Sequence, residues 1–191
     1  LEMKDMDIRY GETFHKPKLV PCQISIKASK AGDDIRVDPG VITMHTMSLK
    51  TSGKITGLTN PNFDLVIGTN DTSMKGWESL VPSLKEYEPD GNFTFQGSMK
   101  GTLGDLSANL QFSAPRLAVK VSQATGGNKD ATPSKSVFEF MDMKVQAEKK
   151  NNDIKGSGNL EIKKGVVMAA AFEKMQAQFD YQNDILGIHG F

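Results

Sequence analysis

Hydrophobic and polar residues alternate along the chain in many short runs, such as Ile24-x-Ile26-x-Ala28 and Phe63-x-Leu65-x-Ile67. Successive side chains of a strand point to opposite faces of a sheet, so this period of two predicts strands with one apolar face. Turn-forming residues separate the runs, as in Asp38-Pro39-Gly40 and Lys150-Asn151-Asn152-Asp153. We count about ten to twelve strands. The pattern predicts a mainly β fold, a strongly curled antiparallel sheet that forms an open half-barrel or groove.

Two segments depart from the period of two. Between residues 73 and 87, Trp77, Leu80, Val81 and Leu84 follow the spacing of one helical face. We predict a helix there, and we expect Pro82 to kink it. The stretch 124–135 is rich in Gly, Asn and Thr and predicts a flexible loop. With these two insertions, residues 1–191 are expected to form a single β-rich domain.

Glycines recur four residues apart in two similar motifs, Gly53-x-x-x-Gly57 and Gly97-x-x-x-Gly101, with a looser echo around Gly156. Residues four apart in a strand share a face, so each pair leaves a strip without side chains. Such a strip permits bending or the close approach of another chain segment, which favours a curled sheet. The alternative is that these glycines fall by chance in solvent-facing strands.

The charge balance excludes one broad class of function. The chain has 23 Lys and Arg against 23 Asp and Glu, which gives a formal net charge of zero. Nucleic-acid binding needs clustered basic residues, whereas the lysines here are scattered among acidic residues. We therefore expect no nucleic-acid partner.

The large side chains suggest a different kind of ligand. The chain has 10 Met and 10 Phe but only 3 Tyr and 1 Trp, so most large side chains carry no strong hydrogen-bonding group. These residues can form an ordinary core. On the inner face of a curled sheet they can also line an apolar groove for acyl chains.

Catalytic and metal-binding motifs are absent from the sequence. We find no nucleophile elbow, phosphate-binding loop or paired-histidine zinc motif. Cys22 is the only cysteine, and His15, His45 and His189 lie in separate predicted elements. The sequence therefore predicts no enzyme, no metal and no cofactor. The alternative is a hydrolase that uses His45 or His15, which a histidine and a carboxylate in one pocket would support.

A set of short motifs, in this order, resembles the C-terminal region of bacterial AsmA-like proteins. The family is similar to TamB and to the bridge-like lipid-transfer proteins. The matching stretch covers roughly residues 40–191. The motifs are Ser52-Gly53-x-x-x-Gly57, Pro61-x-x-Asp64-Leu65, Leu80-Val81-Pro82, Pro89-x-Gly91 and Gly97-x-x-x-Gly101-Thr-Leu103.

The resemblance implies a periplasmic, β-rich module of an envelope protein that is tethered to the inner membrane by a segment outside this sequence. It also implies a non-enzymatic role in phospholipid transport and outer-membrane biogenesis, with envelope proteins as further partners. The chain would then be a fragment of a longer protein, with a phospholipid or another acyl-chain ligand in its groove.

Two sets of residues are our candidates for the ligand site. The helix residues Trp77, Leu80 and Leu84 are expected to close one end of the groove or to pack on its edge. The alternative function is a structural β-sandwich, a scaffold or protein-interaction module of the envelope that holds no ligand. The candidate groove residues are Phe93, Phe95, Met99, Leu110, Phe112, Met143, Val145, Leu160 and Ile162.

Overall fold

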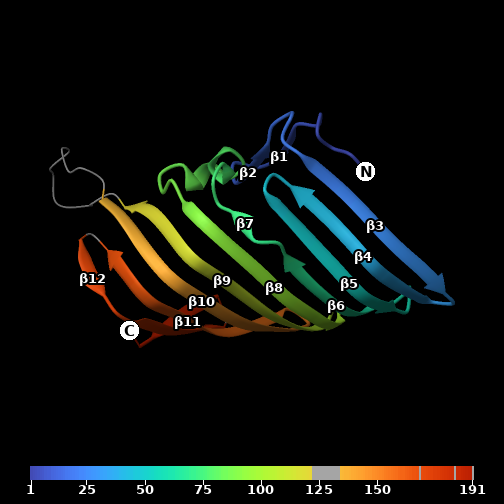
Figure 1. Cartoon of the computed structure of the whole chain (residues 1–191). Helices are drawn as coiled ribbons and strands as arrows, with labels where there is room; N and C mark the ends of the chain where they lie inside the picture. Colours follow the sequence, from blue (N-terminus) through green and yellow to red (C-terminus); the bar gives the residue numbers. More distant parts are fainter. Residues whose placement is uncertain (122–133, 168, 183, 191) are drawn as a thin grey trace.

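A computed structural model describes residues 1–121, 134–167, 169–182 and 184–190. The described chain is mainly β and forms one broad sheet, with a small group of elements at one end of its strands (Figure 1). The first strands are β1 (Ile8–Tyr10), β2 (Phe14–Lys16), β3 (Cys22–Ala31), β4 (Asp34–Met44), β5 (Met47–Thr56), β6 (Asn62–Thr69) and β7 (Thr72–Ser73). They are followed by β8 (Asp90–Thr102), β9 (Asp105–Val121), β10 (Ser134–Lys150), β11 (Asp153–Val167), β12 (Ala170–Phe172), β13 (Met175–Gln182) and β14 (Ile185–His189).

Twelve strands form a single antiparallel sheet in the order β14-β13-β11-β10-β9-β8-β6-β5-β4-β3, with β12 beside β11 and β7 beside β8. Strands β1 and β2 form a separate two-stranded sheet. Neighbours in the large sheet follow the order of the chain, so most connections are hairpins. The prediction of a mainly β, antiparallel fold is confirmed. The sequence predicts about ten to twelve strands; the described residues contain fourteen, twelve of them in the large sheet.

The prediction of a strongly curled half-barrel is wrong, because the sheet is neither closed nor strongly curled. Gly97, in one of the predicted strips, and Gly158, in the looser echo around Gly156, show a physical reason. A Cβ on Gly97 would lie 2.7 Å from the Leu110 side chain, and one on Gly158 would overlap the Phe179 ring. Large side chains of the next strand fill the space at these two glycines. Both positions therefore serve close packing within the sheet.

The predicted kinked helix at 73–87 is also wrong. The segment forms two short 3₁₀ helices, η1 (Trp77–Ser79) and η2 (Pro82–Leu84). Proline disfavours the α conformation in the residue before it, and Val81 is accordingly extended, with φ −121° and ψ 92°. Pro82 therefore interrupts the helix completely and starts a new turn as its first residue.

Two further predictions concern a turn and a loop between strands. Asp38-Pro39-Gly40 does not form a turn, because β4 continues through it and the register with β5 shifts between Val37 and Gly40. The predicted turn is instead an irregularity inside a strand. Most of the predicted loop at 124–135 lies outside the described residues, and its last two residues begin β10.

The sheet is a single layer with an unusually small interior. The accessible surface of the whole chain is 12622 Å², whereas a compact monomer of 20.9 kDa is expected to expose about 9,000 Å². Among the described residues, the buried hydrophobic side chains are Cys22, Leu80, Ala114, Ala118 and Ile162. Globular domains normally bury an apolar sheet face against a second layer. The described residues supply such a layer only near one end of the sheet.

Candidate functional site

The register of the sheet brings the predicted groove residues onto one face. Leu110 pairs with Gly97 and Val145, and Val145 pairs with Gly158. Residues paired across strands share a face, and so do residues two apart along one strand. All nine candidates thus lie on one face, together with further apolar residues. We call this side the apolar face: the nine candidates with Phe63, Leu65, Ile67, Leu106, Met141, Met175, Ala177 and Phe179.

Side chains on the apolar face shield each other but remain open to solvent. Phe93 and Phe112 stack with their ring centroids 5.3 Å apart. Eight of the nine candidates are half-buried, and only Ile162, at 1% exposure, is buried. This arrangement offers a broad hydrophobic surface on which an apolar ligand or a second protein layer can lie.

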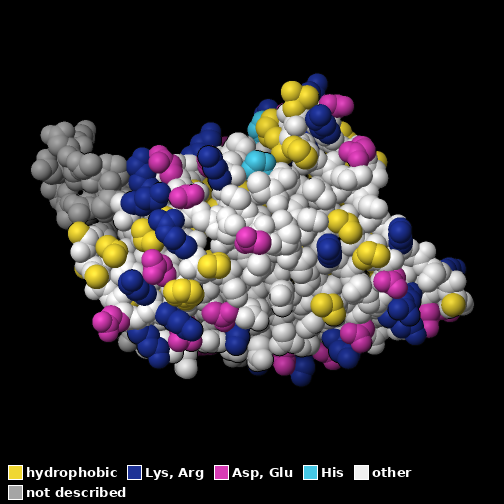
Figure 2. All heavy atoms as spheres, viewed as in Figure 1, with side chains coloured by type: hydrophobic (Ala, Val, Ile, Leu, Met, Phe, Trp, Pro, Cys, Tyr) yellow, Lys and Arg dark blue, Asp and Glu magenta, His cyan; other side chains and the backbone are white. Residues whose placement is uncertain are grey.

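The opposite side, the polar face, consists of the alternate residues of the same strands. Asn109 and Gln111 point there, on either side of Leu110, and both pair with polar residues on β8 and β10. Figure 2 shows a surface whose centre is mostly neither hydrophobic nor charged, with charged side chains gathered toward its margins. The sheet therefore separates two chemically different surfaces.

The polar face borders four large cavities, of about 710, 720, 570 and 490 Å³. The first has a volume of about 710 Å³ and is bordered by residues of β4, β5, β6, β8, β9 and β10. Of the nine candidates, only Leu110 and Val145 border it; most of its other residues are polar. The cavity of about 490 Å³ adjoins it over β10, β11, β13 and β14, that of about 720 Å³ over β3 to β6, and that of about 570 Å³ over β6, β8 and β9. Sequence reasoning missed this hollow, because its hydroxyl and amide residues resemble ordinary solvent-facing positions.

A cap formed by β1, β2, η1 and η2 lies at one end of the sheet (Figure 1). Leu80 is 0% exposed, and its carbonyl accepts a hydrogen bond of 2.7 Å from the backbone N–H of His15. Trp77 donates its indole N–H to Thr46 Oγ1 at 2.9 Å, which ties η1 to the turn between β4 and β5. Leu84 is half-buried in η2. The three predicted end residues therefore belong to the cap, in 3₁₀ turns and the residue between them.

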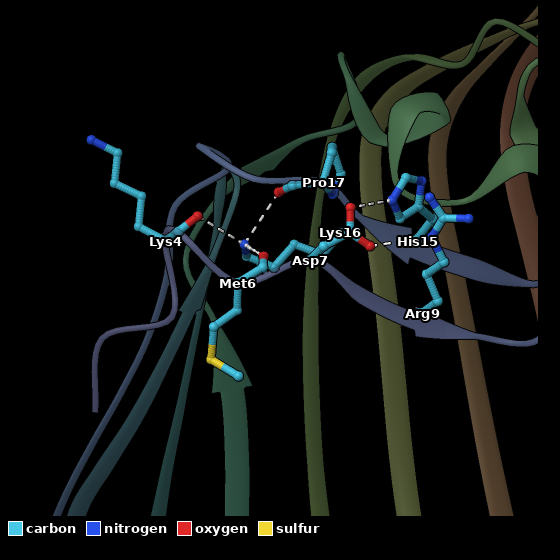
Figure 3. Close-up of polar contacts among 7 residues, drawn as sticks. All are labelled: Lys4, Met6, Asp7, Arg9, His15, Lys16 and Pro17. Carbon is cyan, nitrogen blue, oxygen red and sulfur yellow. Dashed lines mark hydrogen bonds and ion pairs between the residues drawn. The ribbon is translucent and has the colours of Figure 1, made fainter.

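Polar contacts hold the β1–β2 part of the cap together (Figure 3). Lys16 is 0% exposed, and its Nζ donates hydrogen bonds to the carbonyls of Lys4, Met6 and Pro17 at 3.2, 2.8 and 3.2 Å. These three acceptors use all three ammonium donors, which compensates for burial of the charge. Lys16 therefore links the chain before β1 to the end of β2.

Asp7 forms the exposed part of the same cluster. His15 Nε2 donates to Asp7 Oδ2 at 3.1 Å, and Arg9 Nε donates to Asp7 Oδ1 at 3.2 Å. The hydrogen bond from His15 is the main cause that lowers the pKa of Asp7 below its usual value, and Arg9 adds to it. Asp7 and His15 are partly exposed, and neither residue borders one of these cavities.

In the described part of the chain, none of the three histidines forms a hydrogen bond with a nucleophilic side chain. His45 Nε2 donates to the carbonyl of Lys75 at 2.9 Å. His189 and Asp180 contact each other and both line the cavity of about 490 Å³, so a histidine and a carboxylate do meet in one pocket, but at His189 and not at His45 or His15. Among the described residues, no hydroxyl or thiol forms a hydrogen bond with a histidine ring, and no three metal-ligating side chains cluster. Nucleophilic catalysis needs a nucleophile within hydrogen-bonding reach of its base. The described residues place no such nucleophile beside His15, His45 or His189.

Comparison with known proteins leaves the resemblance as a prediction. No family model, curated protein or solved structure matches the chain significantly. In the part of the chain that the structure describes, no helix has the length and apolar character needed to cross a bilayer.

Proposed function

We propose that this chain is a non-enzymatic module that shelters lipid acyl chains on its apolar face. One observation carries the proposal. The described residues form a broad one-layer sheet and leave most of its apolar face uncovered. In keeping with the motif resemblance, we place the module in the periplasm, within an inner-membrane-tethered envelope protein that moves phospholipid toward the outer membrane.

The chemistry of the apolar face suits acyl chains. Phe95, Met99 and Met143 present no strong hydrogen-bonding group, so a hydrocarbon chain meets no polar atom that it would leave unsatisfied. Transfer of each methylene from water onto such a surface contributes about 0.8 kcal/mol. Methionine side chains adapt to ligands of different shape. Binding of this kind is passive and needs no energy source in the module.

A second function is favoured by one observation, the absence of strong curling. An open sheet with one apolar face can also pack against another sheet about 10 Å away and form a sandwich. The module would then be a scaffold or protein-interaction element of the envelope, with its apolar face closed by protein. The two functions differ in whether lipid or a second sheet occupies the same surface.

Uptake of lipid by matched variants tests the proposal. Leu110 lies on the apolar face, and Ser107 lies on the opposite face of the same strand, outside the cavities of about 710 and 490 Å³ and beside that of about 570 Å³. Delipidated wild-type protein, Leu110→Glu and Ser107→Glu are mixed with vesicles that contain a fluorescent phospholipid. We expect Leu110→Glu to lower uptake about tenfold or more, since it places a charge against the hydrocarbon, and Ser107→Glu to leave uptake unchanged.

The controls distinguish the two functions. Circular dichroism checks that both variants keep the β structure. No uptake by the wild-type protein, or equal uptake by both variants, contradicts acyl-chain binding. A lipid-free dimer in native mass spectrometry that Leu110→Glu splits into monomers supports the sandwich instead.

A further inference from the structure

Two polar rows cross the sheet on the side opposite the proposed lipid surface. Register pairs Gln96 with Gln111, Gln111 with Lys144, and Lys144 with Asn159. One step along the strands, Ser98 pairs with Asn109 and Asn109 with Gln146. Both rows run perpendicular to the strands, and both border the adjoining cavities of about 710 and 490 Å³, which share Lys144 and Gln146. The cavities thus form one elongated groove, the polar groove.

The dimensions of the polar groove fit an extended chain. Its rows continue from β6 over β8, β9, β10, β11 and β13 to β14. With about 4.8 Å between neighbouring strands, six steps span about 29 Å. Such a length accommodates several units of a linear polymer.

Amide and hydroxyl side chains are the most numerous polar groups along the polar groove. Each carboxamide offers both donors and an acceptor, which matches an alcohol because an alcohol also donates and accepts. The structure gives the side chains of Gln96, Asn109 and Gln146 no hydrogen-bond partner among the described residues, so these groups are available to a ligand. Gln111 donates to Asp142 Oδ2 at 2.7 Å, which fixes its orientation.

The charge balance of the polar groove and an exposed apolar side chain in it narrow the ligand class. Lys144 and Lys50 are balanced by Asp38 and by Asp180, which contacts His189, so the groove has no excess charge to attract an ionic polymer. Val66 is 55% exposed and offers a small apolar contact beside Ser98. A sugar ring presents hydroxyls at its edge and C–H groups on its faces, which matches this combination.

We propose that the polar groove binds an uncharged, linear glycan that lies across the strands. The chemistry favours a glycan over an extended peptide, because backbone N–H and C=O groups of the inner strands are already paired within the sheet. A peptide gains most of its affinity from free strand edges, which this face does not offer. The proposal concerns the opposite face from the lipid surface and does not depend on it.

Side-chain amide resonances in NMR provide the test. The protein is titrated with cellohexaose, maltohexaose and the hexamer of N-acetylglucosamine. We expect at least one glycan to shift the amide signals of Gln96, Asn109 and Gln146. The double variant Asn109→Ala/Gln146→Ala is expected to weaken that binding about tenfold or more.

The matched control changes two glutamines of the same face that lie outside the groove, Gln176→Ala/Gln182→Ala, and is expected to bind like the wild type. Three outcomes overturn the proposal. They are no shift with any of the three glycans at millimolar concentration, an equal loss in both double variants, and equal binding of an uncharged Ser/Thr/Gly peptide of similar length.

Discussion

The ring of Phe179 on β13 lies over Gly158, its partner on β11, in the space that a side chain at position 158 would need. A Cβ at this glycine would also come within 2.5 Å of the Lys144 carbonyl oxygen. Glycine at position 158 therefore leaves room on the apolar face for the Phe179 ring and for the β10 backbone.

Replacement of Gly158 by alanine tests this packing. We expect Gly158→Ala to lower the free energy of unfolding by about 1–3 kcal/mol, because the ring and the β10 backbone must both move. Urea denaturation measures the effect. Gly104→Ala is the matched control: the nearest atom to its added Cβ is Asn151 Oδ1 at 3.9 Å, and we expect a change within about 0.5 kcal/mol. Equal effects of the two substitutions contradict the packing role.

Leu80 tests the cap in a similar way. Its side chain is 0% exposed, so Leu80→Ala leaves a cavity and is expected to cost about 2–5 kcal/mol of stability. Hydrogen exchange of the His15 N–H, which bonds to the Leu80 carbonyl, reports on the same change. Leu58→Ala, at a position that is 50% exposed, is the comparison and should have little effect. Unchanged protection of the His15 N–H in Leu80→Ala would show that the cap does not depend on this side chain.

Tyr181 gives a prediction at high pH. Its hydroxyl donates a hydrogen bond of 2.7 Å to Asp184 Oδ1, and this bond is the main cause that raises the pKa of the phenol above its ordinary value of 10.0. A group whose pKa is raised on folding contributes stability below its unfolded pKa and loses it as the pH rises through the folded pKa. The link between β13 and β14 should therefore weaken only in strong alkali.

Ultraviolet absorbance of the tyrosinate measures this titration. Asp184→Ala removes both the acceptor and its charge, so the pKa of Tyr181 should fall toward its ordinary value. Subtraction of the Tyr181→Phe curve from each titration isolates the signal of Tyr181. The assignment fails if Asp184→Ala leaves the titration where it was.

The strands and the apolar face were predictable from the sequence because alternation is a local property. Leu110 and Val145 are far apart along the chain. The alternation of apolar and polar neighbours predicts the sheet face on which each lies, and the strand register then places them side by side. The cap was predicted only in part. Spacing placed Trp77 and Leu80 on one helical face, but Pro82 and the extended Val81 replaced the helix with two 3₁₀ turns.

Curvature, bulges and the polar groove were not predictable in the same way. Asp38-Pro39-Gly40 has the composition of a turn, and its placement inside β4 depends on pairing with β3 and β5. The contact between Asp7 and His15 depends on the short hairpin formed by β1 and β2. The rows of the polar groove exist only through the register of seven strands. Such features depend on long-range pairing, which a single sequence does not display.

Methionine methyl groups allow the most direct test of acyl-chain binding. Met99 and Met143 lie on the apolar face, whereas Met6 lies near the cap and is 51% exposed. In ¹³C-methyl NMR spectra of delipidated protein, a fatty acid with a nitroxide on its chain broadens nearby methyl signals. We predict that the signals of Met99 and Met143 broaden at low ratios of fatty acid to protein, while that of Met6 stays sharp. Sharp signals at Met99 and Met143, or equal broadening at Met6, would contradict acyl-chain binding on the apolar face.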